Sequence, residues 1–100
     1  MPRVIFSISY PIKKEARADY LETIEALKNY LTNERGKDYS VFEVKGKPNH
    51  FSEVYICESL DEYDALEEDS DDVTEQLINR IVNDFIKDGK VEYKTLIESV

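Results

Sequence analysis

The chain has 100 residues, a net charge of −9, 41% hydrophobic residues and 11% aromatic residues. This composition is typical of one globular domain over residues 1–100 with a single modest core, and it argues against a disordered chain. With one Cys, one His and three Gly, the chain has too few of the residue types that build disulfides, thiolate metal sites or Gly-rich phosphate loops.

The acidity is concentrated in one segment. Nine acids and no Lys or Arg lie between Glu58 and Asp72, whereas the rest of the chain carries 13 acids and 13 bases. Such a segment is typical of a solvated helix face, and a site for a cation or a basic partner is the alternative. Because it would repel phosphate backbones, we expect no nucleic-acid binding.

The N-terminus gives no targeting signal. Met1-Pro2-Arg3 leads straight into an apolar segment without the pattern of a secretory signal. No apolar run approaches the roughly 18 residues that a membrane span requires. Since the lone Cys57 cannot form an internal disulfide, we expect a cytoplasmic protein that does not bind membranes.

The first half of the chain predicts a strand, a helix and a second strand. Residues 3–10 alternate in polarity as a strand does, and Pro11 ends the strand because it has no N–H to donate. Residues 13–34 predict a helix that stops at Gly36. Its apolar stripe repeats at three- and four-residue steps and comprises Ala16, Tyr20, Ile24, Leu27 and Leu31. Residues 39–45 predict the second strand.

The second half repeats this order. A hairpin loop at 46–50 connects the second strand to a strand at 51–58. Ser59 and Glu62 have the spacing of a capping box, which predicts the start of a second helix. We expect this helix to pause at Asp69-Ser70-Asp71, to continue over 73–87 and to be followed by a strand at 91–98. The apolar face of the later helical stretch comprises Leu77, Ile78, Ile81, Val82, Phe85 and Ile86.

The strands do not alternate cleanly between apolar and polar positions. Ile5 lies opposite the face of Val4 and Phe6, and Val54 and Ile56 lie opposite the face of Tyr55. Two helices can cover only one face of a four-stranded sheet, and soluble monomers avoid large bare apolar patches. We therefore predict a homodimer in which two sheets pack face to face about a two-fold axis.

This element order and the segment from Phe51 to Leu66, FSEVYICESLDEYDAL, resemble the dimeric α/β-barrel superfamily. The greatest similarity is to its antibiotic-biosynthesis-monooxygenase-like members, in which the third strand ends in a Glu and a polar turn before the second helix. The resemblance implies an α+β fold of ferredoxin-like βαββαβ protomers, each with a four-stranded antiparallel sheet. It also implies pairing into a barrel and a small-molecule pocket between the helices and the sheet of each protomer.

The same resemblance argues against haem degradation. Haem-degrading relatives use an Asn on the first strand, with a Trp and a His in the second helix. The corresponding positions here are Ser7 or Ser9, Asp64-Ala65-Leu66, and Leu77 to Arg80. We therefore expect no haem and no other cofactor.

Tyrosines are the best candidates for ligand binding. Tyr10, Tyr55 and Tyr93 fall on three strands, and their hydroxyls could orient a small apolar or aromatic ligand. Tyr20 and Tyr63, on the two helices, would converge on the same cavity if they face the sheet. His50 is a further candidate ligand-binding residue, as a pocket acid or base, although an exposed loop position is the alternative.

No residue pattern identifies a catalytic group or a metal site. Asp69 to Asp72 lacks the ligand spacing of a calcium loop, and Cys57 is expected to be buried and inert. The stretch from Asn49 to Glu53 supplies too little of the aromatic signature of RNA-recognition domains. Two functions remain open: a small-ligand-binding or regulatory homodimer, or a cofactor-independent monooxygenase or isomerase-like enzyme acting on a small aromatic or carbonyl substrate.

Overall fold

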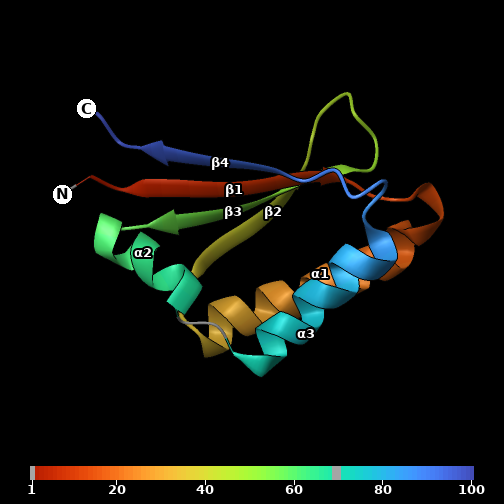
Figure 1. Cartoon of the computed structure of the whole chain (residues 1–100), viewed down its shortest axis with the longest axis horizontal. Coiled ribbons are helices and arrows are strands. Elements are labelled where there is room, and N and C mark those ends of the chain that lie inside the picture. The colour runs from red at the N-terminus through yellow and green to blue at the C-terminus, as the bar shows by residue number, and fades with distance from the viewer. Residues whose placement is uncertain (1, 69–70) are drawn as a thin grey trace.

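Four antiparallel strands form one sheet in the order β2–β3–β1–β4 (Figure 1). The computed structural model describes residues 2–68 and 71–100. The central strands are β1 (Val4–Pro11) and β3 (His50–Cys57), and the edge strands are β2 (Asp38–Glu43) and β4 (Glu92–Ile97). This is the ferredoxin-like α+β arrangement that the resemblance implies.

Three helices lie on one side of the sheet and leave the other side open (Figure 1). Between residues 2–68 and 71–100, none of them is both long and apolar enough to cross a membrane. A 3-10 turn precedes the first helix, and π-helical turns extend the first and the last. The elements are the 3-10 turn Lys14–Ala16, α1 (Arg17–Asn29), the π turn Tyr30–Glu34, α2 (Leu60–Glu68), α3 (Asp72–Arg80) and the π turn Ile81–Phe85.

The predicted element order is confirmed, but several boundaries differ by one or two residues. Pro11 is still part of β1, opposite His50, so the expected hairpin loop is shorter by that His. β2 ends at Glu43 instead of residue 45, because Val44 begins the hairpin turn and its N–H donates to the His50 carbonyl. The first helical stretch begins at Lys14, since Lys13 has an extended backbone.

The two expected helix starts are capped in different ways. The Glu62 N–H donates to Ser59 Oγ at 3.2 Å, whereas the Glu62 carboxylate accepts from the Glu58 N–H and not from Ser59 itself. The reciprocal half of the predicted capping box is therefore displaced by one residue. Of the expected pause at 69–71, positions 69 and 70 lie outside the described residues, and Asp71 caps α3 by accepting from the Thr74 N–H at 2.9 Å.

The core lies between α1 and the sheet. The predicted apolar stripe of the first helical stretch is buried along its whole length, from Ala16 in the 3-10 turn through α1 to Leu31 in the π turn. It packs against the buried side chains of the sheet and against the end of the α3 segment, where Ile81 and Phe85 are buried. The predicted wide apolar face of the last helical stretch is only partly buried, since Ile78 and Val82 stay exposed.

The two faces of the sheet differ in character. On the open face, Ile5 lies between Ile56 and Leu96 in adjacent strands, and Leu96 and Phe42 are 52% and 57% exposed. Several serines and charged residues separate these apolar side chains, which makes this face mixed. The expectation that the helices cover the whole opposite face is wrong at β4, because Tyr93 is 68% exposed on the helix side of this edge strand.

Candidate functional site

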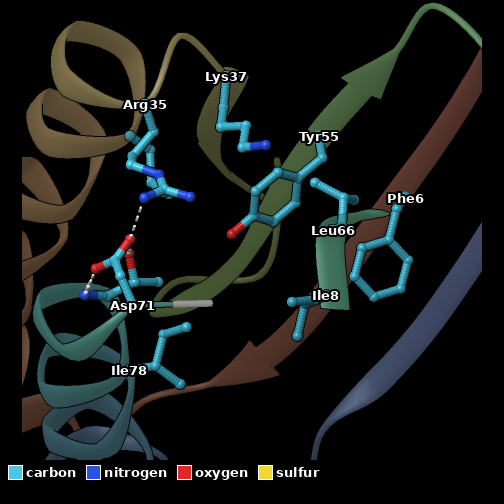
Figure 2. Close-up of a pocket in the computed structure, with 10 residues that line it drawn as sticks. Phe6, Ile8, Arg35, Lys37, Tyr55, Leu66, Asp71 and Ile78 are labelled. Atoms are coloured by element: carbon cyan, nitrogen blue, oxygen red, sulfur yellow. Dashed lines mark hydrogen bonds and ion pairs between the residues drawn. The ribbon is translucent and has the colours of Figure 1, made fainter. Parts of the chain in front are cut away.

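A groove runs between α3 and the helix side of the sheet, and it contains two adjoining cavities. We call the larger one, of about 280 Å³, the outer cavity, and the smaller one, of about 70 Å³, the inner cavity. Both are walled by Ile8 of β1 and Ile78 of α3. The outer cavity (Figure 2) is lined by Phe6, Ile8, Leu31, Arg35, Lys37, Tyr55, Leu66, Asp71, Thr74 and Ile78.

The floor of the outer cavity is aromatic. Phe6 and Tyr55 come from adjacent strands, where they are direct register partners, and their ring centroids are 6.1 Å apart. The ring of Tyr93 stacks on the other side of Phe6 at 6.2 Å. Flat aromatic surfaces of this kind fit planar ligands, with the phenol hydroxyl available to orient them. In Figure 2, Tyr55 directs its hydroxyl into the space between the labelled residues.

Charged side chains form one rim of the outer cavity. The Arg35 guanidinium pairs with the Asp71 carboxylate at 3.2 Å, and Lys37 extends toward Tyr55 (Figure 2). Hydrogen bonding to the Thr74 N–H lowers the pKa of Asp71 below its usual value. The end of α1 positions both cations: Gly36 adopts a φ of +63°, and the Lys37 N–H donates to the Leu31 carbonyl at 2.9 Å.

A buried carboxyl group lies at the inner cavity. Glu53 of β3 is only 5% exposed and receives two hydrogen bonds of 2.6 Å, from the hydroxyls of Tyr10 and Tyr39. The Tyr10 hydroxyl is also 2.9 Å from that of Tyr20. The register explains this convergence, because Glu53 lies opposite Ile8 on one side and Val41 on the other, so Tyr10 and Tyr39 are its diagonal neighbours.

Burial controls the protonation of this cluster. It raises the pKa of Glu53 above the ordinary carboxyl value, and the two phenol hydrogen bonds oppose this increase. Burial also raises the pKa values of Tyr10, Tyr20 and Tyr39, so these phenols remain neutral donors. The cluster therefore presents a carboxyl group that can take up or release a proton inside a mainly apolar space.

Solved structures share the fold of this chain at low sequence identity. A conserved protein from Methanosarcina mazei Go1 matches with a TM-score of 0.81 and 14% identity, over 99% of this chain and 95% of that chain. An antibiotic biosynthesis monooxygenase matches with a TM-score of 0.69 and 18% identity, over 100% of this chain and 98% of that chain. This chain has the antibiotic-biosynthesis-monooxygenase-like fold.

A further match with the same fold comes from an enzyme. A variant of SnoaB, a cofactor-independent oxygenase from Streptomyces nogalater, matches with a TM-score of 0.70 and 9% identity, over 94% of this chain and 90% of that chain. By sequence alone, no protein-family model and no curated protein matches the chain. The antibiotic-biosynthesis-monooxygenase-like assignment therefore describes the fold.

Within this fold, the structure brings together three of the four candidate ligand-binding residues. Tyr55 lines the outer cavity, and Tyr10 and Tyr93 line the inner cavity. His50 lies elsewhere, at the start of β3, where it lines a surface depression together with Lys47 and Pro48. Ligand binding by these four residues stays a prediction. Of the two helix tyrosines, Tyr20 is buried against the sheet, and the hydroxyl of Tyr63 lies 3.1 Å from Thr95 Oγ1.

Glu53, the buried carboxyl group at the inner cavity, was not among the residues predicted for the site from sequence. A signal for it exists: Phe51, Tyr55 and Cys57 share the helix side of β3 with Glu53, so an acidic residue interrupts an otherwise apolar face. The partners Tyr10 and Tyr39 come from other strands and could not be assigned without the register. Cys57 is buried as expected, and burial raises the pKa of its thiol.

No candidate metal centre is present in residues 2–68 and 71–100, since no group of three His, Cys, Asp or Glu side chains there could hold an ion. Of the acidic stretch Asp69 to Asp72, the first two positions lie outside the described residues. Asp71 uses its carboxylate to cap α3 and to pair with Arg35. Asp71 therefore serves as the cap of α3 and as the ion-pair partner of Arg35 at the rim of the outer cavity.

Proposed function

We propose that the protein binds a small, mainly apolar or aromatic ligand in the groove between α3 and the sheet, and that it does so as a homodimer. The observation that supports ligand binding is the outer cavity, which has apolar walls, an aromatic floor and a few charged groups at one rim. Small-molecule sites in proteins have this composition, and their volumes begin at about 300 Å³. A planar bicyclic compound is the expected kind of ligand.

An enzymatic role is the second candidate function. The fold is shared with SnoaB, a cofactor-independent oxygenase, and such chemistry requires little from the protein beyond a dry cavity and a group that accepts protons. Glu53 provides a buried carboxyl group at the inner cavity. This observation favours a cofactor-independent oxygenase or isomerase-like enzyme that acts on an aromatic or carbonyl substrate.

Binding can be tested with 2-naphthol as the probe, titrated into the native protein by calorimetry. Ile78 lines both cavities, so we expect the I78W variant to fill the groove and to weaken binding tenfold or more. Leu21→Trp is the matched control, because Leu21 is similarly exposed, at 40% against 37% for Ile78, but lies on α1. Equal binding by wild type and I78W, or no binding by wild type, would contradict the proposed ligand site.

The homodimer is proposed from the open face of the sheet. Ile5, Ile56 and Leu96 form a row across three strands, beside a surface hollow of about 230 Å³. This hollow gives side chains of a second copy a place to insert. Pairing two such faces about a two-fold axis would remove their exposed apolar area from water. This burial would stabilise the dimer by roughly 25 cal/mol for each Å² of apolar surface.

The oligomeric state can be measured by sedimentation equilibrium at micromolar concentration. We expect a dimer for the wild type and a monomer for Leu96→Asp, because the new carboxylate would be buried without a partner in the interface. Val73→Asp is the matched control, since Val73 has similar exposure but lies on α3, away from the open face. A monomeric wild type would rule out the proposed dimer.

A further inference from the structure

The inner cavity places one carboxyl group among aliphatic side chains. Glu53 shares it with Ile8, Ile81, Ile86 and Val91, and Tyr10 and Tyr93 supply the only other polar side-chain groups among the described residues that line it. No Lys, Arg or His among residues 2–68 and 71–100 forms an ion pair with Glu53. Among the described residues, the hydroxyls of Tyr10 and Tyr39 are therefore the groups that hold the carboxyl group.

Packing does not require an acid at this position. A Gln side chain has nearly the same shape and could hydrogen-bond both phenols without the cost of removing a charge from water. Buried carboxyl groups that line a cavity and have shifted pKa values are more frequent at functional sites than elsewhere. The combination of burial, apolar walls and access to a cavity points to a chemical role for Glu53.

A second polar group lies across the cavity from Glu53. Ile8 is the register partner of Glu53 on one side and of Tyr93 on the other, so these three residues form one row on the helix side of β3, β1 and β4. Neighbouring strands are about 4.8 Å apart, which separates the backbones of Glu53 and Tyr93 by about 10 Å. The inner cavity, of about 70 Å³, has room only for the reacting end of a ketone, so the rest of the molecule would lie in the outer cavity, which Ile8 also lines.

We propose that Glu53 is a catalytic residue that removes a proton from the carbon next to a carbonyl group, in an enolisable ketone bound over Ile8. This proposal rests on the proposed ligand-binding function and names its substrate class. The C–H bond breaks, the proton passes to the Glu53 carboxylate, and the electron pair forms the C=C bond of an enolate whose oxygen accepts a hydrogen bond from Tyr93. Glu53 then returns the proton to the same carbon, or to a conjugated one, so the net reaction is exchange or isomerisation without any other reactant.

The surrounding tyrosines suit Glu53 to this role. Burial raises the pKa of Glu53, which makes its carboxylate a stronger base than an exposed one. The groups that face it are Tyr10 of β1, Tyr20 of α1, Tyr39 of β2 and Tyr55 of β3, all neutral phenols. Tyr10 and Tyr39 are positioning residues, because each holds one carboxylate oxygen.

The test follows hydrogen–deuterium exchange of 2-tetralone, a bicyclic enolisable ketone, by proton NMR in D₂O with the native protein. We expect the protein to accelerate the loss of the α-proton signals about 100-fold over buffer, which is typical of general base catalysis. The isosteric E53Q variant should return the rate to that of buffer. Glu98→Gln, which removes an exposed carboxylate paired with Arg3, is the matched control and should exchange like the wild type.

Two further measurements keep the outcome decisive. If E53Q does not fold, Tyr93→Phe takes its place, because this exposed residue contributes little to the core. The Tyr93→Phe variant should slow exchange about tenfold while 2-tetralone still binds. Tyr39→Phe should move the pH profile of exchange to higher pH, since the Glu53 pKa rises when a donor is lost.

Binding of 2-tetralone without accelerated exchange would overturn the catalytic role but leave ligand binding intact. Failure of 2-tetralone to bind, while 2-naphthol binds, would overturn the proposed substrate class.

Discussion

Replacing Tyr10 and Tyr39 together by Phe is expected to lower the free energy of unfolding by about 4 kcal/mol at pH 8. The rings remain, so apolar packing is nearly unchanged, but the Glu53 carboxylate loses both of its hydrogen-bond donors. An uncompensated buried charge is among the most destabilising features of a protein core. Urea denaturation of the wild type and the double variant at pH 8 measures the difference.

The decrease in the free energy of unfolding that the double variant causes should be smaller at pH 5 than at pH 8. The direction of this difference follows from the raised pKa of Glu53. In the unfolded chain Glu53 titrates near 4.5, and burial raises its folded pKa above that value. A carboxyl group with a raised folded pKa holds its proton longer in the folded state, so its contribution to stability falls as pH rises from about 4.5 through the folded pKa. When the folded Glu53 carboxyl group is protonated it carries no charge, so the loss of the two phenol donors costs less stability. Identical losses at pH 5 and pH 8 would show that Glu53 does not change protonation between them.

A rescue variant provides the control for this interpretation. Adding Glu53→Leu to the double variant removes the buried carboxylate and leaves an apolar core, so most of the lost stability should return. No measurement is made below pH 5, because other carboxyl groups titrate at lower pH. Hydrogen bonds from Arg17 lower the pKa of Glu43 to about 2, and the pKa of Glu98 is also lowered, by hydrogen bonding to Arg3.

Tyr20→Ala is expected to cost about 4 kcal/mol, as for other large aromatic side chains deleted from a core. Tyr20 is fully buried and lies where α1 meets the sheet and the α3 segment, with ring centroids 4.6 Å from Phe51 and 6.3 Å from Phe85. Its removal leaves a cavity at the centre of the core. Thermal or urea unfolding compared with wild type measures this loss.

The adjacent residue supplies a matched control for Tyr20. Leu21 follows it on α1 but is 40% exposed, so Leu21→Ala should cost less than about 1 kcal/mol. Tyr20→Phe removes only the hydroxyl that contacts Tyr10 and should cost about 1 kcal/mol. Similar losses for Tyr20→Ala and Leu21→Ala would mean that the core does not centre on Tyr20.

The fold could be predicted from the sequence because its signals are local. The three- and four-residue repeat of the first helical stretch identifies the buried stripe, Gly36 marks the end of that stretch, and short runs rich in β-branched and aromatic residues mark β1 and β3. The boundaries were less exact where a tertiary contact decides them. Residues 44–45 look like a continuation of β2, but the N–H of Val44 bonds to His50 across the hairpin and begins the turn.

The candidate site was harder to predict because it depends on contacts between distant segments. Tyr10 and Tyr39 meet at Glu53 only through the pairing of three strands, and Arg35 meets Asp71 across the space between two helices. Composition favoured the tyrosines, and Tyr10, Tyr55 and Tyr93 do lie on the helix side of the sheet, where their binding of a ligand stays a prediction. The same reasoning included His50 because its imidazole can act as an acid or base. His50 lies at the start of β3, where it lines a surface depression and neither of the two cavities.

The cluster of tyrosines around one carboxylate also has an optical consequence. The chain has no tryptophan and seven tyrosines, so nearly all of its intrinsic ultraviolet emission comes from phenol rings. A phenol that donates a hydrogen bond to a carboxylate emits weakly, and both Tyr10 and Tyr39 do so. Any event that separates these groups should brighten the emission, which gives the unlabelled protein a built-in fluorescent reporter located at Glu53.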